Sequence, residues 1–155
     1  MEYLVRAARV TDIDRLVALS DGALTMPAAV GPLAAADLMR QLVYLPQASI
    51  VVAESRRLIV GGAVLALRPS VHSGGYVGTI DLLVVDPDHD GERITEALVD
   101  ELLRSASNKG CAVVETVRPD DPSARARLEG MGFDAAGPRL QRIVTAAGAA
   151  GRHTS

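Results

Sequence analysis

The most constraining feature of the sequence is a series of three apolar runs in its middle, joined by short connections. The runs are rich in β-branched residues; they are Ser49–Ala53, Leu58–Leu67 and Tyr76–Val85. Runs of this length and composition are typical of strands, and short connections bring successive strands side by side in opposite directions. The sequence therefore predicts an antiparallel meander of three strands.

The hydrophobic period changes directly after the third run. In Gly91–Asn108 the residues Ile94, Leu98 and Leu102 recur at helical spacing, which predicts a long amphipathic helix. Gly110 is placed to stop this helix, and Cys111–Val117 is again strand-like. A strand, a helix and a further strand form a β-α-β crossover, so the strands at its two ends are expected to run parallel.

Shorter elements are predicted on both sides of this centre. Leu4–Ala7 is expected to be a strand, and Thr11 to open a helix whose capping box is completed by Asp14. A second helix is expected over Leu33–Val43. Near the other end, Asp121 is the expected N-cap of a last helix that has proline at its first position. Phe133–Val144 is expected to supply one or two closing strands.

Length and composition favour one globular domain. With 155 residues, 48% hydrophobic and 23% charged, we expect a single domain over residues 1–146 and a flexible tail over 147–155. The net charge of −3 and the scattered basic residues argue against nucleic-acid binding. No signal peptide or membrane span is visible, so a cytoplasmic location is expected. The histidines and the single cysteine have no metal-ligand spacing, and no metal is expected.

Several fragments of the chain resemble the GNAT superfamily of N-acetyltransferases in their order and spacing. They are Val5–Ala8 with Asp12, Val51–Glu54, Ile59–Gly62, Ile80–Pro87 and Leu128–Phe133. The resemblance implies an α/β (α+β) fold of the acyl-CoA N-acyltransferase type, with a mixed central sheet flanked by helices. It also implies an enzyme that transfers an acetyl group from acetyl-CoA to the amine of a small molecule or peptide. The acceptor cannot be read from the sequence, and homodimer formation stays open.

The strands at the two ends of a β-α-β crossover can splay apart, which leaves unpaired peptide groups along their inner edges. The extended amide chain of pantetheine can pair with such an edge, and the helix N-terminus that follows favours a diphosphate. The resemblance therefore implies acyl-CoA contacts at Leu83 and Val85 on the strand. It implies further contacts at the head of the helix, namely Gly91, Arg93, Ile94 and Thr95.

The loop at the head of this helix departs from the family pattern. Asp90 stands where the family has glutamine or arginine. Arg93 stands where the family has glycine, and Thr95 where it has glycine or alanine. Glycine lets the backbone approach a phosphate closely, and a carboxylate repels one. In the alternative interpretation, Asp88, Asp90 and Glu92 only complement the helix dipole. The chain would then be an inactive GNAT-like binding or regulatory module that has lost acyl-CoA.

The candidate catalytic groups also have two interpretations each. Asp81 lies where many family members have an acidic general base, but its face of the strand is equally suited to solvent. Leu128 replaces the tyrosine that often acts as general acid, and Asp121 is a better cap than cofactor ligand. Glu115 is either part of the acceptor side or an exposed sheet carboxylate. His89 is either a surface residue or a cation for a phosphate.

Overall fold

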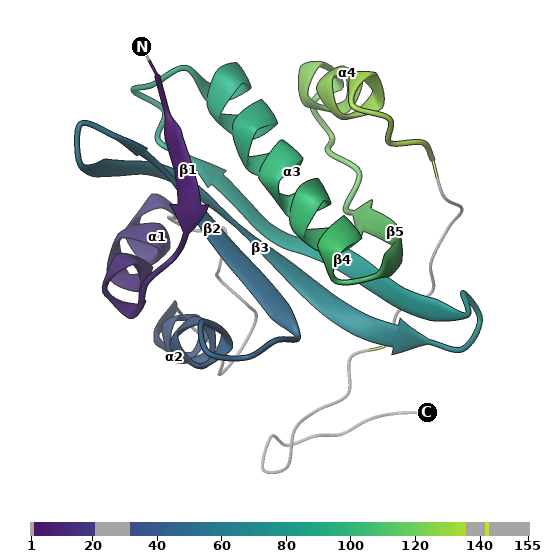
Figure 1. Ribbon diagram of the computed structural model, residues 1–155. Coiled ribbons are helices and arrows are strands. Elements are labelled where there is room, and N and C mark those ends of the chain that lie inside the picture. Colours follow the sequence, from purple (N-terminus) through teal and green to yellow (C-terminus); the bar gives the residue numbers. More distant parts are fainter. Residues whose placement is uncertain (1, 21–31, 136–141, 143–155) are drawn as a thin grey trace. The chain divides into compact units, whose positions relative to one another are not determined.

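The computed structural model describes residues 2–20, 32–135 and 142, and the chain divides into two compact units, residues 1–117 and 118–155. The described residues of the first unit form five strands, which are β1 (Leu4–Ala7), β2 (Ala48–Ser55), β3 (Leu58–Ser70), β4 (Gly75–Val85) and β5 (Cys111–Thr116). They also form a 3-10 turn and three helices, which are η1 (Val10–Asp12), α1 (Ile13–Ser20), α2 (Pro32–Leu42) and α3 (Gly91–Asn108) (Figure 1). The second unit contains helix α4 (Pro122–Gly130).

The strands of the first unit form one mixed sheet in the order β1-β2-β3-β4-β5. Neighbours from β1 to β4 pair antiparallel, so the expected meander is confirmed. Strand β5 pairs parallel with β4, as the β-α-β crossover requires. The sequence thus predicted the fold class and the relative directions of β2 to β5, whereas the antiparallel pairing of β1 with β2 comes from the structure.

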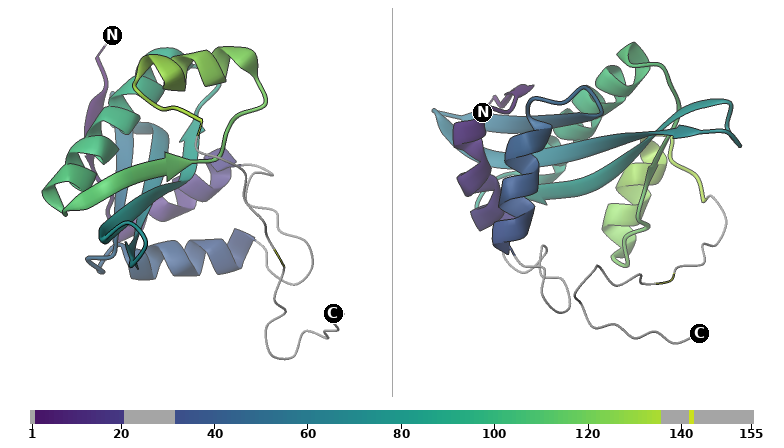
Figure 2. Two further views of the ribbon diagram at one scale, coloured as in Figure 1. Left: turned by 90° about the vertical axis from the view of Figure 1, so that its right-hand side faces the viewer. Right: turned by 90° about the horizontal axis from the view of Figure 1, so that it is seen from below.

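Helices cover both faces of the sheet, with α1 and α2 on one face and α3 on the other (Figure 2). Two adjacent glycines of β3 mark the two faces. A Cβ at Gly61 would meet Ile94 and Leu98 of α3, whereas a Cβ at Gly62 would meet Leu16 of α1. Helix packing at these points is therefore close enough that only glycine fits without rearrangement.

Helix α3 has the predicted bounds. The carboxylate of Asp90 accepts a hydrogen bond from the Arg93 N–H (3.2 Å) and caps its N-terminus. The buried stripe includes Leu98, Val99 and Leu102, all fully buried. After the helix, Gly110 has φ +80°, which is the left-handed conformation that glycine adopts readily and that ends helices.

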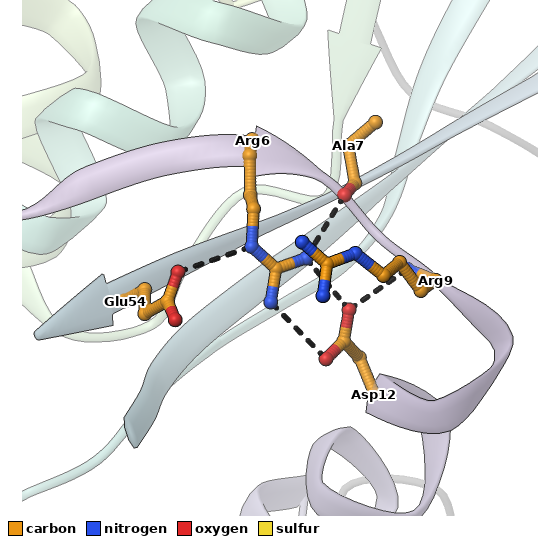
Figure 3. Close-up of polar contacts among 5 residues, drawn as sticks. All are labelled: Arg6, Ala7, Arg9, Asp12 and Glu54. Atoms are coloured by element: carbon orange, nitrogen blue, oxygen red, sulfur yellow. Dashed lines mark hydrogen bonds and ion pairs between the residues drawn. The ribbon is translucent and has the colours of Figure 1, made fainter. Parts of the chain in front are cut away.

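The start of α1 differs from the prediction. The capping carboxylate is Asp12 and not Asp14, because Oδ2 of Asp12 accepts the Arg9 N–H at 2.8 Å and the chain enters α1 through the turn η1. Asp12 also forms an ion pair with Arg6 of β1 (Figure 3). The same arginine forms a second ion pair with Glu54 of β2. Asp14 lies outside this network. The spacing in the sequence fits a cap at either aspartate, and the ion pair with Arg6 favours the earlier one.

The β2–β3 hairpin has a two-residue turn formed by Arg56 and Arg57. Ser55 pairs with Leu58, and the φ angles of the two arginines are 51° and 68°. This is the turn geometry that matches the twist of a hairpin, but it favours asparagine and glycine because a side chain is strained at positive φ.

The second unit begins as predicted. Asp121 accepts a hydrogen bond from the Ala124 N–H at 2.9 Å, and Pro122 is the first residue of α4. Of the expected closing strands over Phe133–Val144, residues 136–141, 143 and 144 lie outside the described residues, as does the expected tail. The single domain over 1–146 therefore stays a prediction.

Candidate functional site

The site begins where β4 and β5 cease to pair. Their parallel pairing runs from Tyr76–Cys111 to Ile80–Thr116 and ends there. Strand β4 continues to Val85, and beyond Ile80 its described partner is β3 alone. Figure 1 shows β5 beside only the first part of β4. The edge of β4 that turns away from β3 is thus without a strand neighbour among the described residues over Asp81–Val85.

The peptide groups on this open edge can be assigned from the pairing on the other side. The Asp86 N–H donates to the Val60 carbonyl of β3 at 2.8 Å. Main-chain groups alternate between the two edges of a strand, so those of Leu83 and Val85 point away from β3. These are the two β4 residues for which acyl-CoA contacts were expected. An extended amide chain laid along this edge can pair with both residues, as an added strand would.

Asp81 lies where the pairing changes. Val64 pairs with Leu82 and Leu65 with Ile80, which leaves Asp81 as the extra residue of a β-bulge. Its side chain is exposed. The described residues thus do not provide the partly buried cleft that the general-base hypothesis assumed, and the role of Asp81 stays a prediction.

The turn after β4 uses its own acidic residues as hydrogen-bond acceptors. Asp86 accepts the Asp88 N–H through Oδ1 (2.9 Å) and the His89 N–H through its carbonyl (3.1 Å). Asp90 accepts the Arg93 N–H through Oδ1 (3.2 Å) and the Ile94 N–H through its carbonyl (3.0 Å). Such amides at a helix N-terminus are the donors that bind phosphate in other proteins. Here aspartate oxygens accept these hydrogen bonds in place of a phosphate.

Two residues from distant parts of the chain complete the turn. Arg15 of α1 pairs with Asp86 at 3.0 Å, and the hydroxyl of Tyr3 accepts a long hydrogen bond (3.4 Å) from the Asp90 N–H. The Arg93 guanidinium lies 5.8 Å from the centre of the Tyr3 ring, within the range of a cation–π contact. The ring also meets His89 edge-on. Sequence reasoning missed Arg15 and Tyr3, since no local pattern connects them with this turn.

The remaining expected contact residues lie at the head of α3. The side chains of Ile94 and Thr95 are buried, so they belong to the core and do not face a ligand. Gly91 is half-buried, and a Cβ there would make only an ordinary contact with Val85 at 3.8 Å. Acyl-CoA contacts with the main chain of these three residues stay predictions. The buried side chains of Ile94 and Thr95 are not placed to contact a ligand.

The two parts of an acyl-CoA molecule therefore fit this chain unequally. The open edge at Leu83 and Val85 suits the amides of pantetheine. In the turn, oxygens of Asp86 and Asp90 occupy several of the amides that a diphosphate would use, and the Arg93 guanidinium lies beside the Tyr3 ring.

Other candidates have structural partners. Glu115 of β5 forms a long ion pair with Arg68 (3.4 Å). Cys111 is half-buried, and burial raises the pKa of its thiol, although the charge of Lys109 lowers it in part. Within residues 2–20, 32–135 and 142, no group of three or more metal-ligating side chains is present. None of the described helices is long and apolar enough to cross a membrane.

Two hollows lie outside the β4 edge. One, of about 340 Å³, is lined by the hairpin arginines and by the start of β1, including Tyr3. The other, of about 290 Å³, lies among β1, β2 and the end of α3. Neither contains any residue expected to bind acyl-CoA.

Comparison with solved structures shows the same fold. An acetyltransferase from Trypanosoma brucei is 25% identical, with a TM-score of 0.70 over 92% of this chain and 100% of the other. A predicted acetyltransferase from Clostridium acetobutylicum, solved with acetyl-CoA, is 19% identical, with a TM-score of 0.75 over 92% and 96%. Glucosamine-6-phosphate N-acetyltransferase from Arabidopsis thaliana is 18% identical, with a TM-score of 0.71 over 92% and 99%.

A search of curated proteins found no match to this sequence. The model of the acetyltransferase (GNAT) family, in contrast, matches residues 13–133, which is most of the chain. This range includes the whole β4-α3-β5 crossover and the turn at the head of α3. The chain therefore belongs to the GNAT acetyltransferase family.

Proposed function

We propose that this protein is an N-acetyltransferase that takes its acetyl group from a pantetheine thioester, with acetyl-CoA as the donor used by the family. The observation that carries the proposal is the open edge of β4 beyond Ile80, where the peptide groups of Leu83 and Val85 have no partner among the described residues. Unpaired main-chain groups are costly unless water or a ligand satisfies them. An extended diamide is a ligand of matching shape.

The residues around the bulge have distinct tasks in this proposal. When bound, acetyl-CoA supplies an activated acetyl group, and its transfer forms a C–N bond, breaks the C–S bond and releases the thiol. The peptide groups of Leu83 and Val85 orient the donor along β4. A carboxylate oxygen of Asp81 takes a proton from the ammonium form of the acceptor, which leaves a neutral, nucleophilic amine.

The acceptor in this proposal is an amine of a small molecule or peptide. A structural relative is named for acetylating an amino sugar phosphate, which is one acceptor of this class. A general base at Asp81 would act on such an amine from the bulge of β4. The exposed position of its side chain leaves room for an acceptor to approach.

The second candidate function is a GNAT-like module that has lost its acyl donor. The specific observation in its favour is the turn in which Asp86 and Asp90 occupy the amides. The two candidates differ in one measurable property, which is whether a pantetheine thioester binds at all.

Isothermal titration calorimetry with acetyl-CoA and with free CoA tests the proposal. The enzyme hypothesis expects saturable heat with both ligands, because both contain the pantetheine arm. No heat at millimolar ligand would refute it and would leave the binding module. Asp81→Asn should leave the affinity for acetyl-CoA unchanged and lower the rate of acetyl transfer to any amine found to be a substrate.

A further inference from the structure

We infer that this chain recognises its acyl donor through the pantetheine arm alone, so that a donor without the diphosphate, an S-acyl pantetheine, binds about as well as acyl-CoA. The inference rests on the proposed function and specifies the donor class of the same site. It follows from the contrast between an edge of β4 that is open and a turn in which most N–H groups already have protein acceptors.

The first observation concerns hydrogen-bond donors. In the turn and the first residues of α3, the N–H groups of Asp88, His89, Asp90 and Arg93 have protein acceptors, and that of Ile94 makes the first hydrogen bond within the helix. Among these described residues, the Gly91 N–H is left without such an acceptor. A diphosphate would have to displace these acceptors before it could use the donors. Exchanging one acceptor for another yields little net binding free energy.

The second observation concerns charge. Asp86 is neutralised by Arg15, with Nη2 and Oδ2 3.0 Å apart, but Asp88 and Asp90 form no ion pair with a described residue. The arginine of the same turn, Arg93, lies over the ring of Tyr3. A carboxylate about 5–7 Å from a phosphate, at an effective dielectric constant of about 20, weakens binding by roughly 50- to 300-fold, and screening by salt at this exposed turn reduces the effect to about tenfold.

The third observation separates the two parts of the site. Leu83 and Val85 offer neutral peptide groups on β4, and their hydrogen bonds to an amide chain do not depend on the charge of the turn. A loss of diphosphate binding therefore leaves the recognition of pantetheine intact. For acyl-CoA, the few phosphate contacts that the turn still allows are offset by the repulsion from its carboxylates, so the diphosphate changes the affinity little.

Calorimetry with the purified full chain tests the inference, with S-acetyl pantetheine and acetyl-CoA titrated separately in the same buffer. The two dissociation constants are expected to agree within about threefold. A dissociation constant for acetyl-CoA at least a hundredfold below that for S-acetyl pantetheine would overturn the inference and leave the proposed function standing. Failure of both ligands to bind at millimolar concentration would refute the proposed function as well.

Asp90→Asn provides a second test that keeps the fold. Asparagine caps a helix as well as aspartate does, so the Arg93 N–H keeps its acceptor while the charge is lost. This variant should bind acetyl-CoA about tenfold more tightly and S-acetyl pantetheine unchanged. Asp100→Asn, an exposed site further along α3, is the matched control and should change neither constant by more than twofold. Equal effects of the two substitutions, or none from Asp90→Asn, would contradict the role given to the turn.

Discussion

Replacing Asp12 by alanine should cost far more stability than the same replacement at Asp14, although both aspartates are ion-paired near the start of α1. Asp12 accepts hydrogen bonds from Arg6 at 2.8 and 3.3 Å and from the Arg9 N–H at 2.8 Å. Its side chain is 10% exposed, and that of its partner Arg6 is 19% exposed. Asp14 pairs with Arg40 at 2.6 Å, but its side chain is 84% exposed.

The burial of the two pairs sets the expected magnitudes. Breaking a buried ion pair from one side costs about 3–5 kcal/mol, because a charge is left without its partner. Arg6 keeps Glu54 at 3.1 Å, so we expect about 3 kcal/mol for Asp12→Ala. An exposed pair contributes roughly 0–1 kcal/mol, so Asp14→Ala should cost about 0.5 kcal/mol. For a chain of this size the first change lowers Tm by about 6–12 °C and the second by about 1–2 °C.

Thermal and urea unfolding, followed by circular dichroism, measure both effects. The pH dependence adds a check. Burial raises the pKa of Asp12, but the hydrogen bonds from Arg6 and Arg9 and their charges outweigh it, so the pKa lies below its ordinary value. The stability that Asp12 contributes is therefore present above about pH 4 and disappears as the pH falls through the lowered pKa. Equal losses for Asp12→Ala and Asp14→Ala at pH 7 would refute the reasoning.

Three further predictions concern other parts of the fold. Arg56→Asn with Arg57→Gly should raise the free energy of unfolding by about 1–2 kcal/mol, because both residues have positive φ. The double alanine variant removes the same charges without relieving the strain, so its stability should not rise. Comparison of the Tm values of the two variants tests this. Gly62→Ala should destabilise by about 1–3 kcal/mol in urea unfolding, since its Cβ would overlap the fully buried Leu16, and an unchanged midpoint would contradict that packing. Cys111 should react with iodoacetamide more slowly at pH 8 than a free cysteine peptide does, because burial raises its pKa; mass spectrometry measures the rate, and an equal rate would contradict this.

Much of the fold was predictable because it follows from local periodicity. The bounds of α3, the cap at Asp121 and the parallel pairing of β5 all follow from spacing within one or two elements. The capping box before α1 was predicted two residues late, at Thr11 and Asp14, because the choice between Asp12 and Asp14 is made by Arg6 on a neighbouring strand. A contact of that kind leaves no periodic signal in the sequence.

The site was predictable only in part for a similar reason. The acidic composition of the turn after β4 is plain in the sequence, but the partners of its carboxylates are not. Arg15 of α1 is 71 residues from its partner Asp86 in the sequence, and Tyr3, which contacts Asp90, lies near the N-terminus. The bulge at Asp81 depends on the register with β3, which composition does not determine.

The central claim is that the outward peptide groups of Leu83 and Val85 hold the acyl donor, and amide hydrogen exchange measured by NMR tests it most directly. Saturation with S-acetyl pantetheine or acetyl-CoA should slow exchange at these two amides at least tenfold. Val84, whose N–H points toward β3 by the alternation along the strand, serves as the internal control and should not change. Saturable binding with unaltered exchange at Leu83 and Val85 would show that the donor is held elsewhere.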